Sequence, residues 1–354
     1  MTSLGFTRRL DEFQRRHAWA SFPLAVVYKF ADDQGPYLAA LITYYGFLSL
    51  FPLFLLLASV LGFLLQGNPE LQRQILDSTL SQFPVIGDQL GEPQGLEGSV
   101  GALVAGALLA TYGALGIAQA VQHAMNVAWS VPRHRRPNPF RARLRSLRLI
   151  AIAGTAIVAT TILSALGSSA GAFGADLGGA GTILAIAVSV VLNVAVFIRV
   201  FTICTPEGTA ARDVVPGAIT AAVNWQLLQL FGTAYVGNVV KGADATYGVF
   251  ALVFGLLAWI YLAALGIVIS TEINVVHARR LYPRALMTLF TDNVDLTAAD
   301  RRAYTDAARA QQFKGFESVT VDYEDDGQQA SARRRARDNA AQPPPEHPAE
   351  QDDA

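Results

Sequence analysis

The chain has 354 residues, of which 52% are hydrophobic and only 16% are charged, and its formal net charge is -1 at pH 7. A soluble globular chain carries about a quarter charged residues, so this composition excludes an ordinary water-soluble domain and indicates a membrane protein. The one cysteine in the sequence excludes an internal disulfide.

Six runs without Asp, Glu, Lys or Arg, each at least 22 residues long, alternate with the charged segments. About 20 apolar helical residues cross a bilayer core about 30 Å thick, and backbone groups in hydrocarbon must be paired within their own helix. The sequence therefore predicts an all-α fold, a polytopic membrane bundle with six transmembrane helices. The predicted spans are residues 37–65, 100–121, 149–171, 182–204, 215–236 and 247–270.

The basic residues are distributed unequally between the connections. Twenty-four of the 27 Lys and Arg residues lie before span one, after spans two and four, or in the tail, whereas the opposite connections hold only Arg73 and Lys241. Because cytoplasmic loops carry the excess of Lys and Arg, we predict that both termini are cytoplasmic. The first 33 residues show no pattern of a cleavable signal, so span one is expected to act as its own signal.

The chain divides by composition into four parts, of which the last is rich in charged residues and proline and is predicted to be disordered. These parts are residues 1–36, a cytoplasmic N-terminal segment; 37–276, the six-helix transmembrane domain; 277–323, a partly helical cytoplasmic tail; and 324–354, the disordered tail.

A short amphipathic helix is predicted over residues 21–33, with Pro23 in its first turn. Its apolar side chains can lie at the headgroup boundary just before span one. We interpret this helix as an elbow that sets the angle at which the chain enters span one, with a role in substrate contact as the alternative. In the tail, Thr297 followed three residues later by Asp300 predicts a capping box at the start of a helix.

Pro52 lies near the middle of span one, shortly after Tyr44 and Ser49. A proline inside a helix removes one backbone hydrogen bond, which here frees the Leu48 carbonyl for Ser49, a water or a ligand. Interrupted helices near the midplane build the substrate sites of many transporters. A purely structural kink is the alternative interpretation of the same residue.

Residues 132–148, which connect spans two and three, contain seven arginines. Anionic lipid of the inner leaflet attracts each basic residue by about 1 kcal/mol. We interpret this segment as a determinant of topology, with specific recognition of lipid or nucleic acid as the alternative.

Arg199 is the most costly residue to place in the membrane because it lies inside span four, about 9 Å from the helix centre near Asn193. Three interpretations are open: snorkelling to the inner interface, an ion pair with Glu272 at the end of span six, and contact with a substrate anion. Asn193 in span four and Asn224 in span five are further polar candidates, for which hydrogen bonding between helices is the alternative.

The sequence contains no recognisable catalytic motif. None of the three lysines follows a glycine-rich phosphate loop, the five histidines lack zinc-binding spacing, and no G-x-S-x-G elbow occurs. We therefore predict a protein that is not an enzyme, with no catalytic residue, no metal, no cofactor and no ATPase of its own.

Several short strings, in this order and spacing, resemble the YihY/BrkB family of bacterial inner-membrane proteins over about residues 20–280. The strings are residues 39–45, 49–52, 215–218, 246–248, 259–261 and 272–274. The family commonly ends its last span in Gly-Ala-Glu-Leu-Asn, whereas this chain has Ser-Thr-Glu-Ile-Asn, which keeps Glu272 and Asn274 in place. The resemblance implies a multi-pass plasma-membrane protein, for which transport and lipid handling are the usual proposals, but it assigns no chemical role to these residues.

The family has also carried a ribonuclease BN label, which we reject for this chain because the zinc ligands of that nuclease are missing. We predict a plasma-membrane protein that moves or reorients a lipid-like or amphiphilic substrate, with membrane lipids as partners and no nucleic acid. A membrane scaffold or envelope-organising protein is the first alternative, and tRNA processing is a distant second. The candidate substrate-pathway or structural polar residues are Tyr44, Ser49, Pro52, Asn193, Arg199, Asn224, Glu272 and Asn274.

Overall fold

Long helices make up most of the chain in the computed structural model, which describes residues 2–64, 100–172, 178–205, 209–235, 245–291 and 294–323. These residues contain no β-strand, as the predicted all-α fold requires. The helices are α1 (Thr2–Arg16), α2 (Ala18–Asp32), α3 (Gly35–Leu64), α6 (Val100–Ala128), α7 (Pro139–Ala172), α8 (Gly178–Cys204), α9 (Val215–Tyr235), α10 (Ala245–Arg279) and α11 (Ala298–Ala310), with short 3-10 turns at Arg133–Arg135 and Ala211–Val214.

Each of the six predicted spans falls on one long helix, from α3 to α10. Within the described residues, two stretches are long and apolar enough to cross a membrane by length and composition, Ala211–Gly232 and Val253–Arg279. The count of six crossings and the cytoplasmic placement of both termini remain predictions. The tail predicted to be disordered, residues 324–354, lies outside the described residues.

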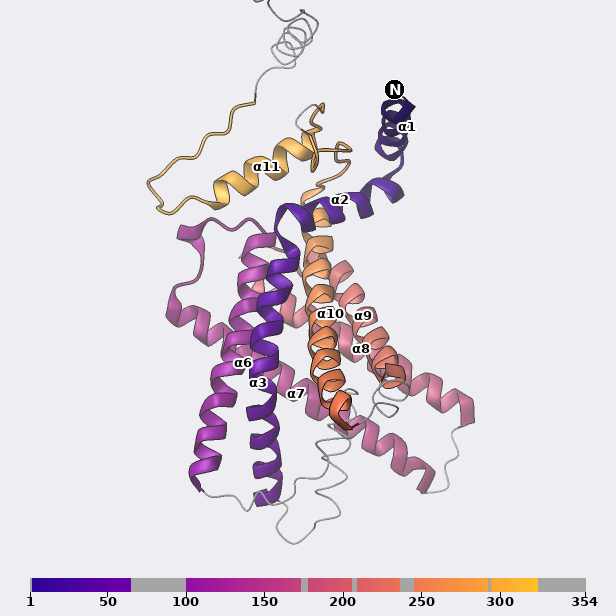
Figure 1. Cartoon of the computed structure of the whole chain (residues 1–354), viewed down its shortest axis with the longest axis vertical. Helices are drawn as coiled ribbons and strands as arrows, with labels where there is room; N and C mark the ends of the chain where they lie inside the picture. Colours follow the sequence, from indigo (N-terminus) through magenta and orange to yellow (C-terminus); the bar gives the residue numbers. More distant parts are fainter. Residues whose placement is uncertain are drawn as a thin grey trace, which may run out of the picture.

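The long helices lie side by side, and the shorter helices α1, α2 and α11 lie together at one end of them (Figure 1). The most extensive helix contact is between α3 and α6, and α10 packs against α9, α3 and α2. The largest cluster of buried apolar side chains draws on α3, α6, α8, α9 and α10, and includes Ile42, Val121, Phe201, Ala218 and Val268.

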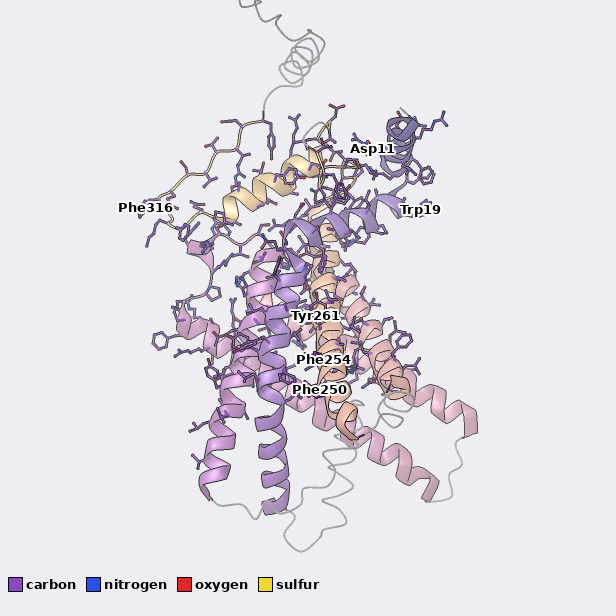
Figure 2. The ribbon with its side chains drawn as sticks, in the orientation of Figure 1. Asp11, Trp19, Phe250, Phe254, Tyr261 and Phe316 are labelled. Atoms are coloured by element: carbon purple, nitrogen blue, oxygen red, sulfur yellow. The ribbon has the colours of Figure 1, made fainter. Side chains whose placement is uncertain are left out.

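Large apolar side chains remain exposed along the outer faces of the long helices. On α10, Phe250 and Phe254 are 63% and 66% exposed, and Leu230 and Phe231 on α9 are exposed to a similar degree. Figure 2 shows Phe250, Phe254 and Tyr261 along α10, and Trp19 on α2. Soluble monomers seldom expose apolar surface on this scale, so these faces suit contact with lipid.

Two glycines of α6 explain why α3 and α6 approach so closely. A Cβ atom at Gly113 would overlap the side chain of Ser49, and one at Gly116 would overlap the ring of Tyr45. Small residues at a helix interface allow the two backbones to come together. The buried Ser49 therefore serves the packing of α3 on α6.

The N-terminal elbow differs in detail from its prediction. The helix α2 begins at Ala18, three residues earlier than expected, so Pro23 lies inside the helix and not in its first turn. The segment upstream, for which no helix is predicted, forms the helix α1. Gln34 has a positive φ of 56° where the chain turns from α2 into α3.

Arg284 joins these shorter helices to the segment that follows α10, and its side chain is fully buried. Its guanidinium donates to Asp32 on α2 at 2.9 Å and to Asp300 on α11. Asp300 also accepts from the backbone N–H of Ala285 at 2.9 Å and closes the predicted capping box with Thr297, which is confirmed. Arg284 thus holds three chain segments in one layer at the end of the bundle.

Candidate functional site

Three ionisable side chains meet inside the protein where α2, α6 and α10 come together. Lys29 and Asp33 lie at the C-terminal end of α2, and Glu272 lies in the last third of α10. The side chains of Lys29, Asp33 and Glu272 are 4%, 8% and 0% exposed. Residues four apart on a helix share a face, so the end of α2 presents Lys29 and Asp33 together to α10.

The ammonium group of Lys29 is at the centre of this cluster. It donates to the Asp33 carboxylate and to the backbone carbonyl of Ala128 on α6 at 3.0 Å, and it lies 3.8 Å from Oε2 of Glu272. Among the described residues, neither carboxyl oxygen of Glu272 has a hydrogen-bond partner. The cluster therefore links three helices through one cation, which lies beside two buried carboxyl groups.

The cluster contains two carboxyl groups for a single ammonium group. Burial raises the pKa of the Asp33 carboxyl, and the charge of Lys29 opposes that rise. Buried like charges cannot both remain ionised at short range without a large cost. One proton on the carboxyl pair would balance the charge of this cluster.

The ion pair between Arg199 and Glu272, one of the three interpretations left open for Arg199, is not formed. Glu272 faces Lys29 at 3.8 Å, whereas Arg199 is exposed near the C-terminal end of α8. The pairing fails because α10 turns the Glu272 side chain toward α2 and into the protein interior, while Arg199 lies on an outer face of the bundle. The other two interpretations of Arg199 stay predictions.

Asn274 lies one half-turn beyond Glu272 on α10 and has a different partner. Its side-chain oxygen accepts a hydrogen bond of 2.7 Å from the backbone N–H of Gly217, in the first turn of α9. The first four N–H groups of a helix lack partners within the helix. Asn274 therefore caps α9 from outside, and Gly217 is required because a Cβ there would overlap the Ser270 carbonyl oxygen.

Replacing Asn274 with alanine is expected to lower the free energy of unfolding by about 1–2 kcal/mol, because the Gly217 N–H loses its acceptor in a buried place. Thermal unfolding of the purified protein in detergent measures the change. An unfolding midpoint equal to that of the wild type would contradict the capping role.

The other candidate residues are not brought into this cluster. Tyr44 is 61% exposed, and the buried hydroxyl of Ser49 donates to the Gly46 carbonyl at 2.9 Å, not to the carbonyl that Pro52 leaves free. The helix α3 continues past Pro52 to Leu64. Asn193 is half-buried on α8.

Asn224 is half-buried on α9 and lies against α10, where a Cβ at Gly266 would overlap its amide group. In the same way, Gly113 leaves room for Ser49 and Gly217 leaves room for Asn274, each a polar residue of the neighbouring helix. Asn224 therefore contributes to the packing of α9 on α10, as the structural interpretation of the intramembrane amides expects.

Sequence reasoning missed Lys29 and Asp33, which complete the site. The segment was interpreted as an interfacial elbow, although Lys29 is one of only three lysines in the chain and stands four residues before Asp33. An i, i+4 pair of opposite charges at the end of a largely apolar helix is the signal that points to these residues.

Comparisons with known proteins agree with the sequence motifs. The model of the family described as virulence factor BrkB matches residues 26–288. The chain is 26% identical over 283 residues to YfkH of Bacillus subtilis (strain 168), named as a ribonuclease-like protein, in a match that covers 74% of this chain and 98% of that protein.

A second relative is the UPF0761 membrane protein of Psychrobacter sp. (strain PRwf-1), which is 25% identical over 295 residues. That match covers 79% of this chain but 53% of the relative, so the chain spans about half the length of that protein. No solved structure matches the chain. The family match includes the strings on which the sequence resemblance depends, and it confirms that resemblance.

Proposed function

The chain belongs to the BrkB family and is a membrane protein, and from this premise we propose that it moves or reorients a lipid-like or amphiphilic substrate in the plasma membrane. In this proposal the six long helices cross the bilayer, both termini are cytoplasmic, and the chain has neither an ATPase nor a catalytic activity of its own.

The observation that carries the proposal is the buried cluster of Lys29, Asp33 and Glu272. Glu272 lies within the apolar stretch Val253–Arg279, and ionisable side chains in membrane-spanning helices mark substrate or ion pathways. The cluster links α2 with α6 and α10, so a change in its protonation alters the contacts of three helices. A packing role alone would be served at lower cost by apolar side chains of similar size.

We expect the variant Glu272→Gln to insert and fold normally but to move lipid about tenfold more slowly than the wild type, which corresponds to about 1.4 kcal/mol of activation free energy. The variant keeps the shape of the side chain and the Lys29–Asp33 pair but removes the titrating group. Lipid movement is measured in reconstituted vesicles as the rate at which a fluorescent phospholipid becomes accessible to a reductant that does not cross the membrane.

The matched control is Glu317→Gln, which makes the same change at an exposed position in the tail and is expected to leave the rate unchanged. Equal rates for Glu272→Gln and the wild type would contradict the role of the cluster. Lipid movement no faster than in protein-free vesicles would contradict the proposed function itself.

Two further experiments separate the alternatives. A scaffold whose tail binds partners predicts that deletion of residues 324–354 abolishes function in cells, whereas we expect the deletion to leave lipid movement intact. Because the relative YfkH is named as ribonuclease-like, purified wild-type protein is also incubated with tRNA, which we expect to stay uncut.

A further inference from the structure

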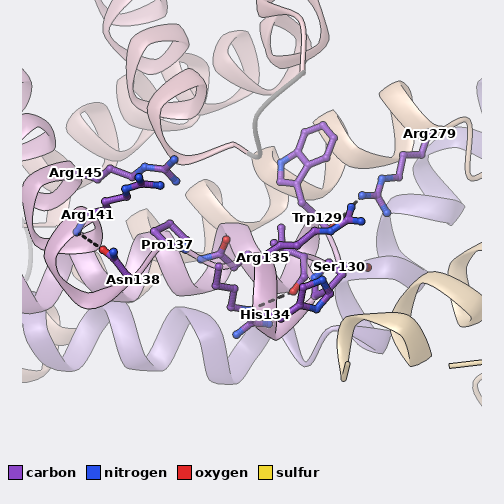
Figure 3. Close-up of a pocket in the computed structure, with 13 residues that line it drawn as sticks. Trp129, Ser130, His134, Arg135, Pro137, Asn138, Arg141, Arg145 and Arg279 are labelled. Carbon is purple, nitrogen blue, oxygen red and sulfur yellow. Dashed lines mark hydrogen bonds between the residues drawn. The ribbon is translucent and has the colours of Figure 1, made fainter. Parts of the chain in front are cut away.

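A second feature lies apart from the buried cluster, in the connection between α6 and α7. A cavity of about 570 Å³ opens between the end of α6, residues 129–138, the first turns of α7 and the end of α10 (Figure 3). Five arginines line it, and none of the described lining residues is acidic. The arginines are Arg135, Arg136, Arg141, Arg145 and Arg279.

The positive charge of this cavity is only partly compensated by the protein. Arg279 pairs with Asp306 at 2.8 Å and also donates to the backbone carbonyl of Trp129 at 2.6 Å. Arg135 and Arg141 have no carboxylate partner among the residues that the structure describes. Burial lowers the pKa of Arg136, and the neighbouring Arg133 lowers it further, so an anion in the cavity would relieve repulsion between these groups.

Guanidinium groups present several donors in a planar fork that matches the oxygens of a phosphate group. Arg141 and Arg145 are one turn apart on α7, so both side chains project to the same side of the helix, and Figure 3 shows them together at one edge of the cavity. The lining therefore offers several charge-assisted donors to one phosphate group.

The face of α7 next to these arginines is apolar and exposed. Phe140, Leu144 and Leu147 are 81%, 50% and 51% exposed, and their spacing of four and three residues places them on one helix face. A ligand with its charged group among the arginines thus has an apolar surface directly beside it. Free phosphate has no apolar group that could pack on this surface, whereas the acyl chains of a lipid could.

We propose that this cavity binds the phosphate headgroup of an anionic phospholipid, with Arg141 and Arg145 as the principal contacts and the Phe140, Leu144 and Leu147 face beside its acyl chains. The inference names the substrate class of the proposed function and rests on that function for the movement of the lipid, but binding is tested separately.

The test measures binding of short-chain phosphatidic acid to the purified full-length protein in detergent by native mass spectrometry, with phosphatidylcholine and inorganic phosphate as comparison probes. We expect Arg141→Ala/Arg145→Ala to bind phosphatidic acid at least about tenfold more weakly than the wild type, because charge-assisted hydrogen bonds are lost. The matched control, Arg143→Ala/Arg148→Ala, removes two exposed arginines of the same helix that do not line the cavity and is expected to bind like the wild type.

Equal weakening in the two double variants would overturn the proposal, because general attraction to a basic surface would then explain binding. Inorganic phosphate that competes as well as phosphatidic acid would also overturn it in favour of a free anion. If the Arg141→Ala/Arg145→Ala protein does not fold, the exposed Arg135→Ala variant takes its place, with the same expected direction. Phosphatidic acid binding without lipid movement in vesicles would contradict the proposed function alone, and lipid movement without binding would contradict this inference alone.

Discussion

Replacing Arg284 with alanine is expected to lower the free energy of unfolding by about 3–5 kcal/mol, the usual cost of removing one partner from a buried ion pair. The side chain is fully buried and contacts Asp32 at 2.9 Å and Asp300. Alanine would leave the fully buried Asp300 without its cation and open a cavity between α2, α11 and the segment after α10. We expect this layer to come apart before the long helices do.

Unfolding of this layer is followed by hydrogen–deuterium exchange of the backbone N–H groups of α11 as the temperature rises, because Asp300 lies on that helix. The control is Arg302→Ala, which removes an exposed arginine of α11 and is expected to change the midpoint little. A midpoint of Arg284→Ala within error of this control would show that the layer does not depend on the buried guanidinium.

Replacing Lys29 with methionine is expected to cost about 3–5 kcal/mol at neutral pH for the same physical reason. Methionine retains most of the side-chain volume but leaves the carboxyls of Asp33 and Glu272 without a cation. The backbone carbonyl of Ala128 also loses its donor. The matched control is Lys314→Met, at an exposed lysine of the tail.

The loss in Lys29→Met is expected to shrink as the pH falls. Burial raises the pKa of Asp33, and Lys29 opposes the rise, so the variant raises this pKa further. The folded state of such a protein holds the proton of this carboxyl more tightly than the unfolded state does. The resulting stabilisation is complete below the unfolded pKa of about 3.9 and is lost as the pH rises through the folded pKa. Unfolding midpoints measured from pH 7 downward test this, and a loss that does not change with pH would rule out the uncompensated carboxyls as its cause.

The helical class and the positions of the long helices could be predicted because the charge-free runs can be found in the amino-acid sequence itself. Helix ends were harder to predict, since α7 begins at Pro139, ten residues before its predicted span. The local signal was present: Asn138 accepts a hydrogen bond of 2.8 Å from the N–H of Arg141, and asparagine followed by proline is typical of a helix start. Hydropathy does not show this helix start, because the first turns of α7 contain several arginines.

The candidate site could be predicted only in part. The family resemblance drew attention to Glu272 and Asn274, but their partners are 243 and 57 residues away in sequence, at Lys29 and Gly217. Hydropathy and spacing carry no information on contacts between residues so far apart in sequence, so Glu272 enters the sequence analysis only as one possible partner of Arg199, the one basic residue inside a predicted span. Packing of α2 against α10, which supplies the true partner, is a property of the folded chain.

Glu272 and Asn274 are two residues apart on one helix, so their side chains leave it in directions separated by about 200°. One engages the elbow through Lys29, and the other engages α9 through Gly217. The helix α10 thus makes a polar contact on each of two nearly opposite faces. A rotation about its axis that is large enough to withdraw Glu272 from Lys29 also withdraws Asn274 from Gly217, so the contacts of α10 with α2 and with α9 would be lost together.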